Sequence, residues 1–389
     1  MLMMCILGCQ RVPVLEIVVW SAFKDQELEL LKKEGAAFAA REGIPVRVVR
    51  VPFEELQPKI QVSVPVGQGP DLITGPHDWI GRFVTADLIA PVDFPAADLE
   101  PFLPVSLDTM RYEGKFYGLP LSVTAIGLVT NRGLLPTPPD TMAELIAQAR
   151  KLTDGQRYGF LFDDLDFYFA YPVFGGYGAT LFTPGQDDAK VGLASEGAVR
   201  AAQFLADLHL KEKLMPVGTT KNTANDRFLR GECAMTITGP WALREYRDQK
   251  IDYVFTPIPR LDNGRWPTPL VGVDGVMLAR SSRNPDLARG LMLALADREA
   301  QVQLNLAAGR IPARRDAQAD PRVASNPDVQ AIGRSVEKGT PMPSIPAMAQ
   351  VWQPMQDALK LVTSGKVAAP DALREAVERI ETNVRMMKR

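Results

Sequence analysis

The sequence predicts an α/β protein, and the order of its first segments carries that prediction. Residues 15–20 (LEIVVW) form a β-branched run typical of a buried strand. The next segment repeats apolar residues at helical spacing, from Asp25 as a helix cap to Gly43 as a stop, and residues 45–51 (PVRVVRV) return to strand character. A strand, a helix and a second strand in this order predict a parallel sheet flanked by helices.

The rest of the chain continues this alternation. Thr141 and Glu144 have the spacing of a capping box, which predicts a helix through Leu152. Proline-rich joints at residues 135–140 and 340–346 are too short to be flexible linkers, so the 389 residues suit two lobes between which the chain crosses more than once. Further helices are predicted at residues 196–210, 285–296, 351–362 and 371–387, and further strands at residues 71–74, 234–238, 253–257 and 271–278.

Charge and hydropathy exclude several kinds of partner. Lysine plus arginine total 44 against 46 for aspartate plus glutamate, and the net charge of -2 provides no basic surface for nucleic acid or an anionic membrane. Beyond the first residues, no apolar run approaches the roughly 20 residues that cross a bilayer. We therefore expect a water-soluble body with neither nucleic acid nor membrane lipid as its ligand.

The amino terminus reads MLMMCILGCQ, and residues 6–9 (ILGC) are similar to a bacterial lipobox, in which cleavage leaves a lipidated cysteine. This predicts that Cys9 tethers the protein outside the cytoplasm. No basic residue precedes Arg11, so the segment departs from an ordinary secretion leader, and a short apolar tail on a cytoplasmic protein is the alternative. Cys233 would be the one thiol left after cleavage, and its apolar surroundings predict a small buried hydrophobe.

Common enzyme motifs are absent from the sequence. It has no phosphate-binding loop ending in Gly-Lys-Ser/Thr, no Gly-x-Ser-x-Gly elbow and no His-Glu-x-x-His. His77 and His209 are the only histidines, which leaves little material for a metal site or a catalytic triad. A catalytic pair of His77 with Asp78 is conceivable, but a locally hydrogen-bonded turn is the favoured interpretation. We expect no catalytic residue, no metal and no cofactor.

An acidic cluster beside aromatic residues points to a different chemistry. Asp163, Asp164 and Asp166 could bind a hard cation, act as the acid and base of a glycosidase, or form a polar loop. The next residues, 167–172 (FYFAYP), place aromatic rings beside these carboxylates. Sugars present apolar C–H faces and hydroxyl rims, so flat rings next to hydrogen-bond acceptors are typical of a carbohydrate site. Ordinary core packing is the competing interpretation of the aromatic residues.

Three tryptophans stand at the predicted ends of elements. Trp79 follows one strand, and Trp352 begins a late helix after a proline joint. Trp241 follows Gly239 and Pro240 and is expected on a turn at a strand end, where α/β proteins place their ligands. Large aromatic residues at exposed turns favour ligand contact over core packing.

Taken in order, these segments resemble the maltose-binding protein group of family 1 extracellular solute-binding proteins, over residues 15–383. The resemblance implies the two-lobed periplasmic-binding-protein fold of type II, with a sugar in the cleft between the lobes. It also implies a monomer that catalyses no reaction and delivers sugar to ABC permease subunits in the membrane. The matching blocks are residues 69–83 (GPDLITGPHDWIGRF), 111–141 (RYEGKFYGLPLSVTAIGLVTNRGLLPTPPDT), 228–241 (FLRGECAMTITGPW), 269–276 (PLVGVDGV) and 338–352 (KGTPMPSIPAMAQVW).

The resemblance also implies a lobe organisation and a mechanism. Residues 1–11 would be leader and tether, residues 12–122 with 274–325 one lobe, and residues 123–273 with 326–389 the other. The three crossovers are then expected near residues 123–126, 271–275 and 323–327. Closure would be a hinge motion, in which sugar favours the closed state because only that state engages it from both lobes.

The sugar-contacting positions follow from the same resemblance, one residue at a time. Asp78 and Asp166 are expected to accept hydrogen bonds from hydroxyls, and Tyr168, Trp241 and Trp352 to stack on sugar faces. Lys24 or Asp25 falls where the family grips the sugar with a charged pair. The implied set is Lys24, Asp25, Asp78, Trp79, Thr124, Asp166, Tyr168, Trp241, Met342 and Trp352.

Three positions depart from the maltose binder and leave the sugar open. Gly75 stands where that protein has a tryptophan, Trp79 where it has an arginine, and Thr124 where it has a glutamate. A stacking platform would then move from position 75 to position 79. These changes argue against maltose itself and leave a maltodextrin, trehalose, sucrose or another glucoside as candidates. A polyamine or peptide binder is the rival within the binding class, because amines also favour aromatic rings near carboxylates. A glycosidase that uses two of these carboxylates is the enzyme alternative.

Overall fold

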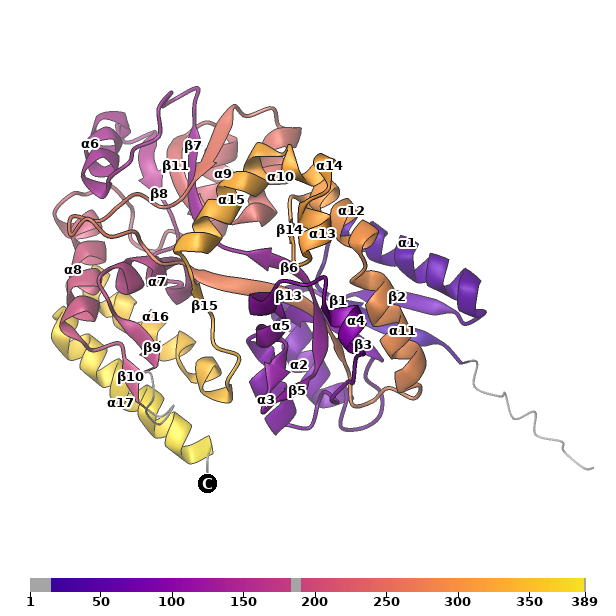
Figure 1. The fold of residues 1–389 in the computed structure, drawn as a ribbon. Helices are drawn as coiled ribbons and strands as arrows, with labels where there is room; N and C mark the ends of the chain where they lie inside the picture. The colour runs from indigo at the N-terminus through magenta and orange to yellow at the C-terminus, as the bar shows by residue number, and fades with distance from the viewer. Residues whose placement is uncertain (1–14, 183–189, 388–389) are drawn as a thin grey trace, which may run out of the picture.

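The computed structural model describes residues 15–182 and 190–387, and Cys9, the expected lipidation site, lies outside them. Two separate sheets organise the described chain (Figure 1). The larger sheet has the order β14-β6-β13-β3-β1-β2, with β15 paired to β13, and the smaller has the order β12-β7-β11-β8. The strands of the larger sheet are β1 (Ile17–Ser21), β2 (Val46–Arg50), β3 (Leu72–Pro76), β6 (Gly118–Thr124), β13 (Leu270–Leu278), β14 (Ile311–Pro312) and β15 (Thr340–Pro341). Those of the smaller sheet are β7 (Gly127–Asn131), β8 (Tyr158–Leu161), β11 (Cys233–Thr238) and β12 (Tyr253–Thr256).

The predicted α/β opening is confirmed. β1 pairs in parallel with both β2 and β3, and α1 (Asp25–Glu42) makes the first crossover. Gly43 ends α1 in the left-handed region at φ 70°, a conformation that glycine adopts without strain. The prediction of Asp25 as the helix cap is wrong, because Lys24 occupies the cap position and Asp25 is the first helical residue, at φ 50°.

Around the smaller sheet, the sequence patterns are also confirmed. Thr141 and Glu144 form both bonds of the capping box: the threonine hydroxyl accepts from the Glu144 amide at 3.2 Å, and the Glu144 carboxylate accepts from the Thr141 amide at 3.3 Å. The helices of this part are α6 (Met142–Leu152), α7 (Phe167–Gly176), α8 (Glu196–Leu210), α9 (Lys221–Leu229), α10 (Pro240–Asp248), α15 (Pro327–Lys338), α16 (Trp352–Thr363) and α17 (Ala369–Met387), with the 3₁₀ helix η1 (Pro346–Gln350).

The remaining helices cover the larger sheet or lie at the junction of the two halves (Figure 1). They are α2 (Phe53–Ser63), α3 (Trp79–Thr85), α4 (Ala96–Leu99), α5 (Pro104–Thr109), α11 (Pro285–Leu295), α12 (Arg298–Ala308), α13 (Arg315–Gln318) and α14 (Pro321–Ala324). Two short hairpin-like pairs complete the described chain: β4 (Arg111–Tyr112) with β5 (Lys115–Phe116), and β9 (Thr180–Phe182) with β10 (Val191–Gly192).

Each sheet has its own hydrophobic core, and we call the two resulting units lobe 1 (larger sheet) and lobe 2 (smaller sheet). The buried side chains of the lobe 1 core come from residues 17–123 and 271–313, and those of the lobe 2 core from residues 126–270 and 302–384. Since the two sets alternate along the chain, the protein is a two-lobed α/β structure in which both lobes are discontinuous in sequence. Ala317 and Val323 already pack in the lobe 2 core.

The lobes touch on two sides of the junction. Gly81 on α3 lies directly against the segment that leads into η1, because a Cβ atom at position 81 would come within 2.4 Å of the Ser344 carbonyl oxygen and 2.6 Å of the Pro346 nitrogen. On the other side, Arg244 of α10 donates to the Ala307 carbonyl in the last turn of α12 at 3.2 Å. The two lobes are therefore in direct contact in this structure.

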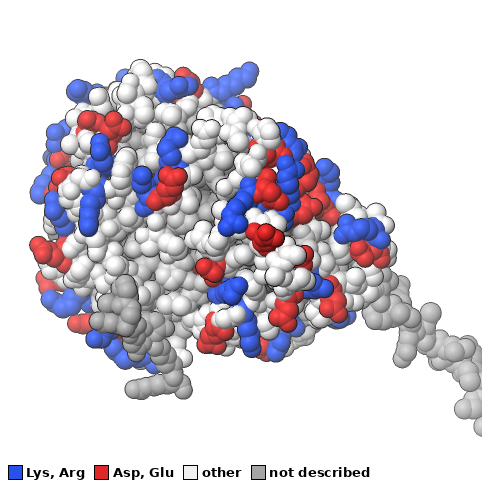
Figure 2. Space-filling view, in the orientation of Figure 1, with Lys and Arg blue, Asp and Glu red and all other residues white. Residues whose placement is uncertain are grey.

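The surface carries charges of both signs. Lysine and arginine side chains alternate with aspartate and glutamate over the face shown in Figure 2, in keeping with the net charge of -2. Among the described residues, none of the helices is long and apolar enough to span a bilayer.

Candidate functional site

The site lies where β6 and β13 reach the junction of the lobes. Gly272 pairs with Thr124 across these strands, and a Cβ atom on Gly272 would lie 3.0 Å from the Thr124 methyl group and 4.0 Å from the Tyr168 hydroxyl. Glycine at position 272 therefore allows a lobe 1 strand and a lobe 2 side chain to approach closely. The Thr124 hydroxyl is buried and has no partner among the described residues.

Asp78 is a carboxylate placed at the junction without a cation. It follows β3 and occupies the cap position of α3, but its side chain makes no capping bond to that helix. Burial raises the pKa of Asp78 to about 7, and the nearby Asp274 charge adds to the shift, while the hydrogen bond from its own amide opposes it. Buried carboxylates normally have a partner, so Asp78 is available to accept hydrogen bonds from a ligand.

His77 is a structural residue and not half of a catalytic pair. Its Nδ1 accepts from the Val273 amide at 3.0 Å and its Nε2 donates to the Met342 carbonyl at 2.7 Å, so the ring is the neutral Nε2–H tautomer. Burial lowers the pKa of His77, which keeps that tautomer. Both ring nitrogens are occupied, and the ring ties β3 to β13 and to the segment that carries the buried Met342.

A second acidic group beside Asp78 is neutralised by an arginine that the sequence analysis missed. Arg310 donates from Nε to Glu27 at 2.7 Å and from Nη1 to Asp274, and its guanidinium lies 5.0 Å from the centre of the Phe23 ring. The three charged side chains are only 12–16% exposed. Although burial opposes its charge, Glu27 and Asp274 raise the pKa of Arg310. The residues of this cluster come from α1, β13 and the connection between α12 and β14, and no local motif connects them.

On the lobe 2 side, Asp166 both begins a helix and faces the junction. Its carboxylate accepts from the Tyr168 amide at 3.0 Å and so caps α7. Burial raises the pKa of Asp166, and Asp163 adds to the shift. Burial likewise raises the pKa of Tyr168, and the charges that contribute to this shift, Asp274 first, come from both lobes.

Aromatic rings continue this lobe 2 surface. The Tyr168 ring lies 6.4 Å from that of Trp241, which is 39% exposed and stands at the rim. The expectation of Trp241 on a turn is wrong: Gly239 caps α10, Pro240 is its first residue, and the indole lies in the first helical turn. Trp352 is half-buried at the start of α16, 6.5 Å from Phe167.

Trp79 and Gly75 form a single packing unit in lobe 1. A Cβ atom on Gly75 would lie 2.7 Å from the Trp79 ring, so the indole occupies the space that any larger residue at position 75 would need. Trp79 is 5% exposed and packs on Phe53 and Phe83, with ring centres 5.5 and 5.6 Å away. The Trp79 indole therefore presents little surface to a ligand in this structure.

The structure therefore brings together most of the predicted residues but not all of them. Asp78, Thr124, Asp166 and Tyr168 surround the junction, and Met342 is joined to it through His77. Lys24 and Asp25 are exposed at the start of α1, and the described residues show no side-chain contact from either to this group.

The acidic cluster of the sequence separates into three different roles. Asp163 accepts from the amides of Asp166, at 3.1 Å, and Lys221, at 2.9 Å, and Asp166 caps α7. Asp164 is buried against His209 at 2.7 Å. Within the described part of the chain, no group of histidine, cysteine, aspartate and glutamate side chains could hold a metal ion.

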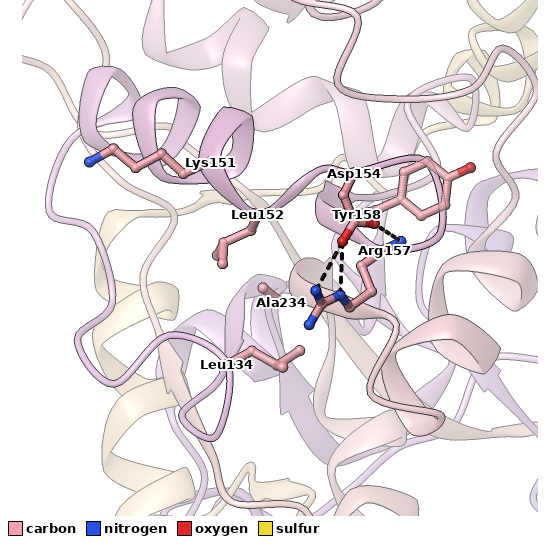
Figure 3. Close-up of a pocket in the computed structure, with 7 residues that line it drawn as sticks. All are labelled: Leu134, Lys151, Leu152, Asp154, Arg157, Tyr158 and Ala234. Carbon is pink, nitrogen blue, oxygen red and sulfur yellow. Dashed lines mark hydrogen bonds and ion pairs between the residues drawn. The ribbon is translucent and has the colours of Figure 1, made fainter.

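A separate small pocket lies on the outer side of lobe 2, between α6 and β8 (Figure 3). It holds about 70 Å³ and is bordered by the Asp154–Arg157 ion pair, at 2.9 Å, and by Leu152 and Tyr158. Ligand sites of proteins usually enclose ~300 Å³ or more, so this pocket is too small for a sugar and is not the site.

Comparison with known proteins agrees with the geometry. The family model described as "Bacterial extracellular solute-binding protein" matches residues 35–331. The galactooligosaccharide-binding protein of Bacillus subtilis (strain 168) is 30% identical over 93% of this chain and 88% of its own. The maltotriose-binding protein of Pyrococcus abyssi (strain GE5 / Orsay) is 28% identical over 88% of this chain and 76% of its own. In these relatives the similarity extends over both lobes.

A solved structure is similar in three dimensions as well. The Thermus thermophilus maltotriose-binding protein, bound to maltotriose, superimposes with a TM-score of 0.89 and 32% identity over 95% of this chain and all of that chain. The chain thus has two discontinuous lobes, with hydrogen-bond acceptors and aromatic rings at their junction. It also matches these relatives in sequence over most of its length. The chain belongs to the bacterial extracellular solute-binding protein family.

Proposed function

We propose that this protein is the oligosaccharide-binding component of an ABC importer, which captures a maltodextrin-like glucoside between its lobes outside the cytoplasm. The observation that carries the proposal is Asp78, a half-buried carboxylate without a cation among the described residues, whose charge acts on Tyr168 of the other lobe. Names of the relatives support the substrate class, since they are binding proteins for galactooligosaccharide, maltotriose and maltodextrin. Trehalose and sucrose remain candidates of the same chemistry.

The residues divide the recognition of a sugar between polar and apolar contacts. Asp78 and Asp166 would accept hydrogen bonds from hydroxyls, and the orphan Thr124 hydroxyl would join them. Tyr168, Trp241 and Trp352 would stack on the C–H faces of successive glucosyl units. Lys24, Asp25 and Met342 would contribute at the edges, and Trp79 through its packing under Gly75.

Binding and closure would then be one event. Lobe 1 supplies the acceptor Asp78, and lobe 2 supplies the rings together with Asp166, so a sugar gains its full set of contacts only when the lobes meet. Sugar would then shift the population towards the closed form. We keep the bounds expected from the sequence, residues 12–122 with 274–325 for lobe 1 and residues 123–273 with 326–389 for lobe 2, except at the third crossover, which we place before Ala317 because Ala317 and Val323 pack in the lobe 2 core. The closed form would be the one that permease subunits recognise, and the protein itself would catalyse no reaction.

Isothermal titration calorimetry of protein lacking residues 1–9 tests the proposal. Maltotriose, maltotetraose, galactotriose, maltose, trehalose and sucrose form the panel, with spermidine as the control for an amine binder. We expect micromolar or tighter binding of at least one oligosaccharide and no heat with spermidine. Binding of spermidine alone, or hydrolysis of any of the sugars, would contradict the proposal.

A further inference from the structure

Lobe 2 contains a buried pair of ionisable side chains, Asp164 and His209, which is not among the proposed sugar contacts. We call this pair the couple. Asp164, in the loop after β8, is fully buried, and the side chain of His209, near the end of α8, is 2% exposed. His209 Nε2 lies 2.7 Å from Asp164 Oδ2, and Nδ1 lies 3.1 Å from the Met215 carbonyl oxygen. The second carboxylate oxygen, Oδ1, is buried and has no partner among the described residues.

The geometry fixes the number of protons that this couple holds. Both ring nitrogens face acceptors, so one hydrogen must lie on Nδ1 and a second between Nε2 and Oδ2. The second proton can reside on nitrogen, as imidazolium with carboxylate, or on oxygen, as imidazole with carboxylic acid, and either state is neutral overall. Its loss would leave a negative charge in the core and two lone pairs facing each other at 2.7 Å.

Burial and pairing act on His209 in opposite directions. Burial lowers the pKa of His209, but the hydrogen bond and the charge of Asp164, with the Met215 carbonyl, outweigh it, so that the pKa is raised. A raised pKa means that the couple stabilises the fold fully below the ordinary histidine value of about 6.5, and that this contribution is lost as pH rises through the higher folded-state value.

Asp164 lies within the loop that supplies the sugar contacts. On one side of it, Asp163 accepts from the amides of Asp166 and Lys221, and on the other, Asp166 caps the helix that carries Tyr168. His209 is the only hydrogen-bond partner of the Asp164 side chain among the described residues. Expulsion of a charged Asp164 from the core would therefore displace the residues on both sides of it.

From this connection, and given the proposed sugar site, we propose that the Asp164–His209 couple positions the Asp166 and Tyr168 loop for sugar and that loss of its shared proton at alkaline pH weakens binding. The two residues do not touch the sugar; they act through Asp166 and Tyr168. Sugar affinity of this protein should thus fall at high pH for a reason located in the core of lobe 2.

Within the described part of the chain, Asp164 is the one charge that contributes to the pKa of His209, although α16 also carries Lys360 and Asp357. On α8 and the loop after it, Asp207 is bonded to Lys211 at 2.8 Å, and Glu212 is paired with Arg150. The packed helix α7 carries no charged residue, and on α16 Asp357 is paired with Arg379 of α17 at 3.0 Å. Asp164 is the charge that acts on the pKa of His209.

Nuclear magnetic resonance can observe the proton directly, because the chain has only two histidines. In ¹⁵N-labelled protein, we expect the His209 ring to titrate above the ordinary histidine value of about 6.5, in one step that also moves the Asp164 carboxyl carbon. His77, with Nδ1 accepting and Nε2 donating, should stay the neutral Nε2–H tautomer over the same range and is the internal control. Titration of His209 near 6.5, uncoupled from Asp164, would overturn the proposal.

Calorimetry with maltotriose between pH 6.5 and 9.5 tests the consequence for binding. We expect the wild-type affinity to fall roughly tenfold over the pH range in which the magnetic resonance titration shows His209 losing its proton, a typical coupling between linked sites. The double variant Asp164→Leu with His209→Leu removes the couple without leaving an unpaired partner and should bind at pH 7.5 but lose the alkaline decline. If that variant does not fold, the double variant Asp164→Asn with His209→Gln, a hydrogen-bonded amide pair without a titrating group, replaces it.

If the affinity for maltotriose falls by the same factor at high pH in the wild type and in the double variant, the positioning role of the couple is contradicted. Absence of maltotriose binding at every pH would instead count against the proposed function, and the magnetic resonance titration would still decide on the couple. Asp78, with a pKa of about 7, also titrates at the lower end of this pH range. Its effect on maltotriose affinity should be the same in the wild type and in the variant.

Discussion

The two faces of the junction are built from different chemistry. On lobe 1, the side chains are charged and enclosed: Arg310 holds Glu27 and Asp274 together, and Asp78 is left without a partner. On lobe 2, the side chains are aromatic and more open, with Trp241 39% exposed at the rim. A sugar needs hydrogen-bond acceptors around its rim and flat surfaces on its faces, and although Asp166 adds an acceptor to lobe 2, the acceptor Asp78 lies on lobe 1, so the full set of contacts needs both lobes. This difference explains why closure and recognition would be coupled.

The largest effect should come from breaking the charge cluster of lobe 1. Arg310→Met leaves Glu27 and Asp274 buried without their cation, and removal of one member of a buried ion pair costs about 3–5 kcal/mol. We expect the free energy of unfolding, measured with urea, to fall by that amount. Arg132→Met removes an exposed partner of Asp252 and is the matched control, with an expected loss below about 1 kcal/mol. Equal losses in both variants would contradict the enclosed character of lobe 1.

On lobe 2 the corresponding change is Trp241→Ala. Loss of a partly exposed aromatic anchor should weaken oligosaccharide binding by about 2–4 kcal/mol while the melting temperature changes little, because the indole lies at the rim. Calorimetry with maltotriose and a thermal melt of the free protein measure the two quantities. Trp266→Ala, a half-buried tryptophan beside Arg260 and Lys338, is the control and should leave the affinity unchanged. An unaltered affinity in Trp241→Ala would remove the stacking role.

Asp78→Asn sharpens the contrast within lobe 1 and should have the smallest effect of the three. Hydrogen bonds to a charged group contribute about 1.5–3 kcal/mol, so we expect affinity to fall roughly 10- to 100-fold. Because the pKa of Asp78 is raised, its ionisation destabilises the free protein as pH rises from about 4 to above 7. Asparagine should flatten that decline in thermal melts, whereas the exposed control Asp93→Asn should not change it. A steeper decline in Asp78→Asn would show that the carboxylate has a cation partner.

Local patterns in the sequence predicted the elements of the fold well. The helical period that ends at Gly43 and the capping box of Thr141 and Glu144 are confirmed because each depends on residues within a few positions of one another. Trp241 was misplaced on a turn, although proline is common at the first position of a helix and Pro240 occupies that position.

Contacts between distant segments could not be predicted in the same way. Arg310 meets Glu27 283 residues away along the chain, and Asp164 meets His209 across 45 residues. No periodicity in the sequence connects such positions. The ion pairs form only when the folded sheets bring these side chains together. The roles of the predicted sugar contacts stay predictions, since they depend on a ligand that engages both faces at once.

Distance measurement between the lobes tests the central claim most directly. Spin labels on Glu54→Cys in α2 and Asn222→Cys in α9 place one probe on an exposed position of each lobe, and the buried Cys233 should not react. In protein lacking residues 1–9, double electron–electron resonance should show a shorter label separation with maltotriose than without it, and no shortening with spermidine. A sugar that binds while the distribution of distances stays the same would contradict capture by closure of the two lobes.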